Sequence, residues 1–226
     1  MVYDWFFNST GVKSVKGACA GRAGIYESSG MMKIDITEIL ESILETVHSH
    51  KLGDGQYARY HACRGAKINA YGCADAANIL YSLRSLPRDR AERDAFVAAI
   101  RSFQDPASGY FLEGSHHKIH TTAHCTAALE LFDALPLYPF TDMEQYLDAA
   151  HFERYMMEEY DFLHYGRAAH AGAGIYAAFS ITGKASPEFK KAYFDFFDRT
   201  CSPTTGLWEK DPVPEFTRHV PDRAPL

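Results

Sequence analysis

The chain has 226 residues, of which 46% are hydrophobic and 14% aromatic, and its formal net charge at pH 7 is −6. That length and apolar content are enough for one sizeable hydrophobic core. The negative charge and the scattered basic residues exclude the basic patch that nucleic-acid binding requires. No apolar run approaches the roughly 20 residues of a membrane-spanning helix. We therefore expect a globular protein that neither binds nucleic acid nor spans a membrane.

The cysteines indicate the redox compartment. There are 5 of them, an odd number, and none forms a CxxC pair. The N-terminal segment MVYDWFFNSTGVKSVKG places its apolar residues before its lysines, the reverse of a secretory signal. Free thiols in a reducing compartment fit this pattern, so we expect a cytoplasmic location.

Composition divides the chain into three parts. Residues 1–31 are rich in Gly, Ser and Lys and show no sustained period, so we expect a poorly ordered N-terminal extension. Residues 32–210 carry helical periodicity and are expected to form the folded domain. Residues 211–226 are rich in proline and are expected to form a loop-like C-terminal tail.

The spacing of apolar residues predicts seven helices and no strand. Glycines at 53 and 55 are expected to end the first helix, because glycine is preferred just past a helix C-terminus. The fifth begins with Thr141 or Asp142 as N-cap and Glu144 in position for a capping box. The seventh begins with Ser186 as N-cap followed by Pro187. In chain order the predicted ranges are 33–50, 71–87, 88–104, 120–136, 141–163, 165–183 and 186–201.

Internal repetition predicts the architecture. Aligning Pro87 with Pro136 lays GCADAANILYSLRSLP over TAHCTAALELFDALP, which sets Asp75 opposite His124. AAHAGAGIYAAFSIT continues the series, with His170 at the same place. These Ala-rich segments carry little charge, as crowded inner helices should, whereas the others have a charged outer face. The pattern predicts an all-α fold of helical hairpins packed side by side around an axis.

The segments SFQDPASGYF and HTTAHCTAALELFDAL resemble the repeat of the terpenoid cyclase and protein prenyltransferase superfamily, which runs Gln, turn, Gly, aromatic and then a Thr/Ala-rich inner helix. The resemblance covers residues 36–208, and AAHAGAGIYAA is also similar to inner helices of lanthionine cyclases. It implies an α/α toroid with a cavity near one end of the inner helices. It also implies that Tyr57, Phe111 and Trp208 clamp successive hairpins. Seven helices are too few to close such a toroid, so we expect an open, incomplete barrel, which missing sequence or self-association would complete.

Three polar residues occupy equivalent positions early in the inner helices: Asp75, His124 and His170. If the hairpins share a cavity, these side chains converge on it as general acid and base, because histidine titrates near neutral pH and a carboxylate can fix its tautomer. The alternative is that they cap or bridge neighbouring helices through hydrogen bonds. Other polar residues are expected to bind the substrate, namely Tyr71, Asn78, His120, Tyr165 and Arg167.

Two motifs could indicate a metal or dinucleotide site, and each also has a structural explanation. In HHxxHxxxH (116–124), His120 and His124 share one helical face and could reach one ion. A third carboxylate ligand is missing nearby, so we favour a polar loop at the cavity mouth and expect no metal. GAGIYA (172–177) satisfies GxGxxA, but a dinucleotide site needs a preceding strand. We interpret its glycines as close helix packing and expect no cofactor.

Three functional hypotheses follow. The first is an enzyme that binds a polar, carbohydrate-like small molecule or oligosaccharide, with His124 or His170 as base and Tyr71 or Tyr165 as proton donor in a lyase or hydrolase reaction. The second is an isoprenoid-binding, prenyl-transfer or cyclase-like protein, although its DxDD motif and zinc-ligand sets are absent from the sequence. The third is a non-catalytic helical-repeat module that binds a partner.

Overall fold

The computed structural model describes residues 35–59, 66–114, 116–159 and 168–206. The chain divides into two compact units, Met1–Asp35 and Ile36–Leu226, and every helix and strand of the described residues belongs to the second. The predicted N-terminal extension (1–31) and C-terminal tail (211–226) lie outside the described residues, as do Trp208, Tyr165 and Arg167.

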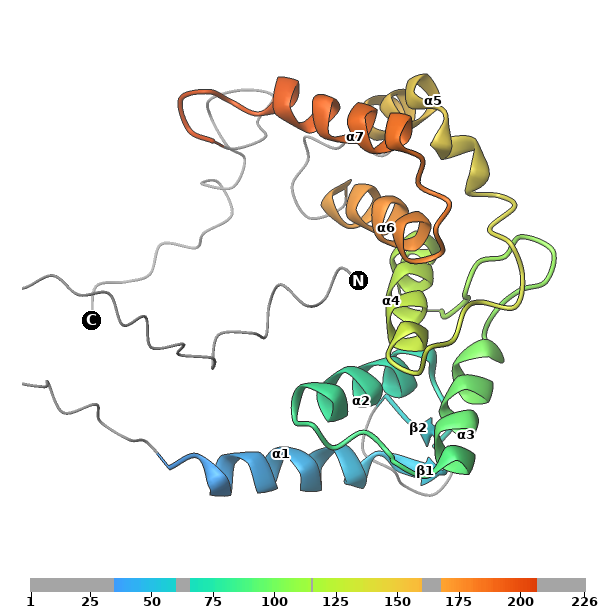
Figure 1. Ribbon diagram of the computed structural model, residues 1–226, viewed down its shortest axis with the longest axis vertical. Helices are drawn as coiled ribbons and strands as arrows, with labels where there is room; N and C mark the ends of the chain where they lie inside the picture. The colour runs from blue at the N-terminus through green and yellow to red at the C-terminus, as the bar shows by residue number, and fades with distance from the viewer. Residues whose placement is uncertain (1–34, 60–65, 115, 160–167, 207–226) are drawn as a thin grey trace, which may run out of the picture. The chain divides into compact units, whose positions relative to one another are not determined.

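The described part of the chain is mainly helical, as the sequence predicts, with seven α-helices and one short hairpin (Figure 1). The toroid itself stays a prediction. In chain order the elements are α1 (Thr37–Ser49), β1 (Lys51–Gly53), β2 (Gln56–Tyr57), α2 (Ala70–Ser82), α3 (Arg90–Arg101), α4 (Lys118–Glu130), η2 (Glu144–Leu147), α5 (Ala149–Arg154), η3 (Tyr155–Glu159), α6 (Ala168–Ile181) and α7 (Pro187–Thr200). No helix among the described residues is both long and apolar enough to cross a bilayer.

The three Ala-rich helices are neighbours. Helix α4 packs against both α2 and α6, and α3 packs against α2 and α4 (Figure 1). A Cβ atom added at Gly174 would lie 2.9 Å from Ile119 Cγ2 of α4, and one at Gly172 would lie 2.8 Å from Met156 Cε. The glycines of GxGxxA therefore serve close helix packing, as predicted. This contact brings α6 against the helix that carries His120 and His124.

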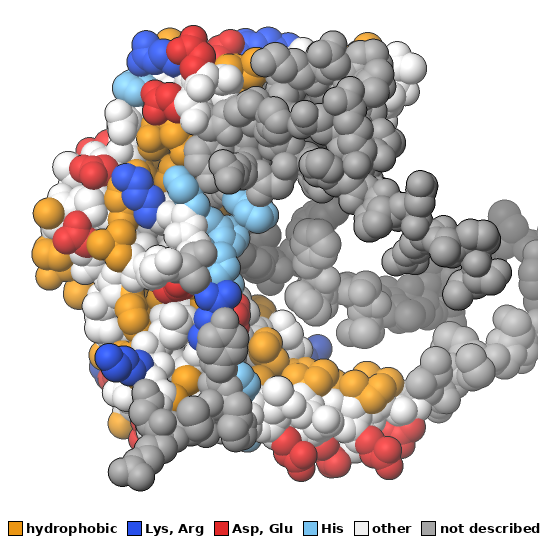
Figure 2. Space-filling view, turned by 180° about the vertical axis from the view of Figure 1, so that it is seen from behind, with side chains coloured by type: hydrophobic (Ala, Val, Ile, Leu, Met, Phe, Trp, Pro, Cys, Tyr) orange, Lys and Arg blue, Asp and Glu red, His pale blue; other side chains and the backbone are white. Residues whose placement is uncertain are grey.

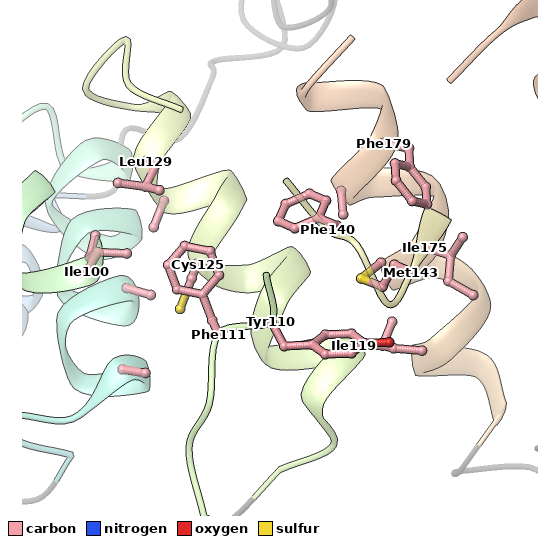
Figure 3. Close-up of a cluster of buried hydrophobic side chains, with 14 of the residues drawn as sticks. Ile100, Tyr110, Phe111, Ile119, Cys125, Leu129, Phe140, Met143, Ile175 and Phe179 are labelled. Atoms are coloured by element: carbon pink, nitrogen blue, oxygen red, sulfur yellow. The ribbon is translucent and has the colours of Figure 1, made fainter. Parts of the chain in front are cut away.

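The core lies on both sides of α4. In Figure 3, Cys125 of α4 and Phe111 lie between Ile100 on one side and Ile175 and Phe179 on the other. Phe111 is fully buried, and its backbone N–H donates to Thr122 Oγ1 at 2.9 Å. Tyr57 is also buried and stacks on Phe96, with the ring centroids 5.4 Å apart. Tyr57 and Phe111 are therefore packing residues, as the sequence predicts.

Gln104 ties the turn after α3 to a more distant segment. Its Nε2 donates to Gly109 O at 2.9 Å and to Tyr138 O at 2.8 Å. Its Oε1 accepts from Leu137 N at 2.8 Å and from Tyr138 N at 3.1 Å. Gly109 has φ +78°, and a Cβ there would lie 1.9 Å from Pro139 O. The Gln–turn–Gly part of the repeat is therefore a hydrogen-bonded clamp between two loops.

The prediction that the chain has no strand was wrong. Lys51–Gly53 and Gln56–Tyr57 pair antiparallel, and α1 ends at Ser49, before the glycines. Gly55 has φ +67°, and a Cβ there would lie 2.2 Å from Phe96 N. The glycine therefore serves a tight turn against α3 instead of a helix end. Strands this short leave no alternating pattern in a sequence.

The prediction of one continuous helix over 141–163 was also wrong. The chain forms the 3₁₀ turn η2, the short helix α5 and the π-helical turn η3 instead. The predicted capping box of Thr141 or Asp142 with Glu144 does not start a helix. Asp148 is the N-cap of α5, and its Oδ1 accepts from His151 N at 2.8 Å. An aspartate that bonds the backbone in this way interrupts one helix and starts another. The predicted cap of α7 is confirmed, because Ser186 Oγ accepts from Phe189 N.

Candidate functional site

The structure brings the three predicted catalytic residues to one region of the surface. His124 Nε2 of α4 lies 2.7 Å from Asp75 Oδ1 of α2. The His170 ring of α6 stacks on that of His120, with centroids 4.8 Å apart and planes inclined by 22°. His120 in turn lies 6.3 Å from His124, centroid to centroid. Figure 2 shows histidine side chains gathered side by side on this face.

Local helix geometry explains the convergence. His120 and His124 are four residues apart on α4 and so share a face, and Tyr71 and Asp75 are likewise four apart on α2. His170 lies in the first turn of α6, which packs closely on α4 through Gly174. We define the histidine cluster by the six residues that these contacts join: Tyr71, Asp75, His116, His120, His124 and His170.

Tyr71 supports the imidazoles instead of facing solvent. Its ring stacks on His116 at 3.9 Å and on His124 at 4.9 Å, centroid to centroid. Its hydroxyl is buried and meets hydrogen-bond geometry with no group in the described residues. Burial raises the pKa of Tyr71 to about 12, although the nearby Thr121 hydroxyl acts in the opposite direction. Tyr71 therefore stays protonated near neutral pH and is a platform for the rings.

The four histidines of 116–124 do not all join the cluster. His117 caps α4, because its Nδ1 accepts from Ile119 N at 3.4 Å. Burial, with a smaller contribution from the charge of Lys118, lowers the pKa of His117. His116 Nδ1 lies 3.4 Å from Glu113 Oε2, and the Glu113 side chain is only 4% exposed. His116 and Glu113 were not predicted as site residues. Their spacing, a glutamate three residues before a histidine, was the available signal.

His120 occupies the middle of the cluster. Burial lowers its pKa, and the neighbouring His170, His124, His116 and His117 lower it further because each would repel a second positive charge. In the free protein His120 is therefore neutral at neutral pH.

We expect the pH dependence of stability to report this shift. The folded pKa of His120 lies below the ordinary 6.5, so the unfolded chain binds more protons, and stability falls as pH decreases through that interval. His120→Gln should lose less stability than the wild type between about pH 7.5 and pH 5, measured by urea denaturation. His48→Gln on α1 is the matched control and should retain the wild-type dependence. Equal slopes of the free energy of unfolding against pH in all three proteins would contradict the lowered pKa of His120.

The remaining predicted residues contribute less. Asn78 Nδ2 donates to Ala74 O of its own helix at 2.9 Å, which restricts its use in binding. Tyr165 and Arg167 lie outside the described residues. A cavity of about 460 Å³ lies away from the cluster, and its Arg101 guanidinium is held by Leu135 O. It is lined by Ala98, Arg101, Ser102, Gln104, Leu137 and Tyr138.

The cluster can perform proton transfer with an oriented imidazole. In the residues that the structure describes, no three His, Cys, Asp or Glu side chains meet in a geometry that would hold a metal ion. The Asp75 and His124 side chains are 55% and 24% exposed, so both are accessible to a solute.

Comparison of the chain with protein-family models, with curated proteins and with solved structures finds no match in any of the three.

Proposed function

We propose that the protein is an acid–base enzyme, a lyase or hydrolase, that acts on a polar, carbohydrate-like substrate at the histidine cluster. The observation that carries this proposal is the 2.7 Å contact between His124 Nε2 and Asp75 Oδ1, which joins two helices at an accessible surface. A carboxylate that orients an imidazole is the arrangement that prepares a histidine for proton transfer.

We infer the role of each His124 nitrogen from the direction of this hydrogen bond. An ionised carboxylate can only accept a hydrogen bond, so the proton of neutral His124 lies on Nε2. Its Nδ1 then has the free electron pair and acts as the base. His170 is exposed and stacks on His120, so we assign the complementary proton transfer to it. Because the Tyr71 hydroxyl is buried, Tyr71 is assigned to support the rings and not to donate a proton.

The substrate class is argued from the polarity of the cluster. Imidazoles and a carboxylate offer hydrogen bonds to hydroxyl groups, whereas isoprenoid chemistry would use an aromatic-lined pocket. A non-catalytic binding module would need no oriented base. Both alternatives are outcomes of the test below.

The test is a turnover assay with neutral and acidic oligosaccharides, with the products identified by mass spectrometry. Hydrolysis adds one water to the products, whereas lysis leaves their summed mass unchanged and creates a C=C bond. We expect turnover by the wild type, loss of it in His124→Ala, and full activity in His48→Ala, which removes a histidine from α1. Lack of turnover over the whole panel, or an active His124→Ala protein, would refute the proposal.

A further inference from the structure

The imidazoles of the cluster differ in their carboxylate partners. His124 is paired with Asp75, and His116 with Glu113. None of the hydrogen bonds among the described residues involves a ring nitrogen of His120 or His170, and no described carboxylate pairs with either ring. His120, which lies beside both paired imidazoles, and its neighbour His170 therefore have no anionic partner of their own in the described part of the chain.

Stacking limits how these two rings can be protonated. Their centroids are 4.8 Å apart and their planes are nearly parallel. Two neutral rings, or one neutral and one charged, are compatible with this contact. Two imidazolium ions at that distance repel each other unless an anion compensates their charge. Full protonation of the pair therefore requires an anion from outside the cluster.

We propose that His120 and His170 form an oxyanion subsite beside the Asp75–His124 pair, where a carboxylate or phosphate-type group binds together with protons taken up from solvent. If the bound group is part of the substrate, the substrate is an acidic saccharide; this part of the inference rests on the proposed function. Oxyanion binding itself does not depend on that function.

The surrounding charges agree with this assignment. The titratable groups facing His120 are His116, His117 and His124 from α4 and the loop before it, Tyr71 from α2, and His170 from α6. The carboxylates of Asp75 and Glu113 contact His124 and His116, respectively, and not the central pair. Protonation of the central pair therefore creates a local positive charge that an oxyanion would neutralise.

The experiment is isothermal titration calorimetry of the full chain with sulfate, glucuronate and glucose at constant ionic strength, at about pH 5.5, 6.5 and 7.5. Sulfate stays a dianion throughout, so any pH dependence comes from the protein. Uptake of one proton tightens binding by about tenfold per pH unit below neutrality. We expect this for sulfate and glucuronate, and no binding of glucose at this subsite. Tighter binding of glucuronate than of sulfate would identify a sugar acid as the ligand, and the reverse order a free oxyanion.

Variants localise the effect. His120→Gln and His170→Gln should each reduce the pH slope, and the double variant should abolish it, whereas His48→Gln should retain it. NMR titration of the wild-type imidazoles offers a readout without substitution, because sulfate should raise the pKa of His120 and His170. Three results would each overturn the subsite. They are absence of oxyanion binding near pH 5.5, an unchanged pH slope of binding in the double variant, and imidazole pKa values that sulfate does not change.

Asp75→Asn separates this proposal from the enzymatic one. If the variant loses turnover and keeps pH-dependent sulfate binding, both proposals are supported. If it keeps turnover while sulfate binding follows the expected slope, the acid–base assignment fails and the subsite stands. If Asp75→Asn loses turnover but sulfate binding by the wild type does not depend on pH, the subsite alone is refuted.

Discussion

Replacement of Gln104 with leucine is expected to lower the free energy of unfolding by about 3 to 5 kcal/mol. Gln104 is 6% exposed and uses both ends of its amide, so leucine would remove four hydrogen bonds at once. The backbone groups of Gly109, Leu137 and Tyr138 would lose these partners at the junction of the two loops, where the Gln104 side chain itself is buried. Leaving buried polar groups unsatisfied costs more than the bonds contribute on average.

Urea denaturation monitored by circular dichroism measures this change. Gln145→Leu is the matched control, because Gln145 is exposed and its amide makes one bond, to Asp142 O. We expect the control to change stability by less than about 0.5 kcal/mol, as is usual for surface sites. Gln104→Glu keeps the acceptor oxygen but not the two N–H donors. Its loss of stability should therefore lie between those of Gln104→Leu and Gln145→Leu. A loss below about 1 kcal/mol in Gln104→Leu would show that the clamp is not a major stabilising feature.

Asp75→Asn is expected to lower kcat by about 10²- to 10⁴-fold under the proposed function, with a much smaller change in KM. The amide can still occupy the same space beside His124. It can also donate a hydrogen bond, so it no longer requires the proton to be on Nε2. The base is then present but held in the wrong tautomer for part of the time.

Two measurements distinguish this role from a structural one. The ¹⁵N shifts of His124 report which ring nitrogen carries the proton, and they should move toward the other tautomer in Asp75→Asn. Asp94→Asn is the control, because Asp94 forms an exposed i,i+4 pair with Arg90 on α3. We expect unchanged kinetics there. Wild-type kcat in Asp75→Asn would remove the carboxylate from the mechanism.

The sequence by itself predicted most helices and the meeting of the three catalytic candidates. Apolar periodicity and local caps such as Ser186 are properties of neighbouring residues, so they can be identified without coordinates. The repeat placed Asp75, His124 and His170 at equivalent positions. Repeats that pack in the same orientation would turn such positions toward the same side. The contacts of α4 with α2 and α6 agree with that reasoning.

Only the tertiary structure decided which partner each polar group has. The hairpin at 51–57 depends on Gly55 passing close to Phe96, and Gln104 depends on a segment more than 30 residues away. Tyr71 is a buried platform because His116 and His124, more than 40 residues away in the chain, cover its ring. Such pairings depend on distances between residues remote in sequence, and periodicity carries no information about those distances.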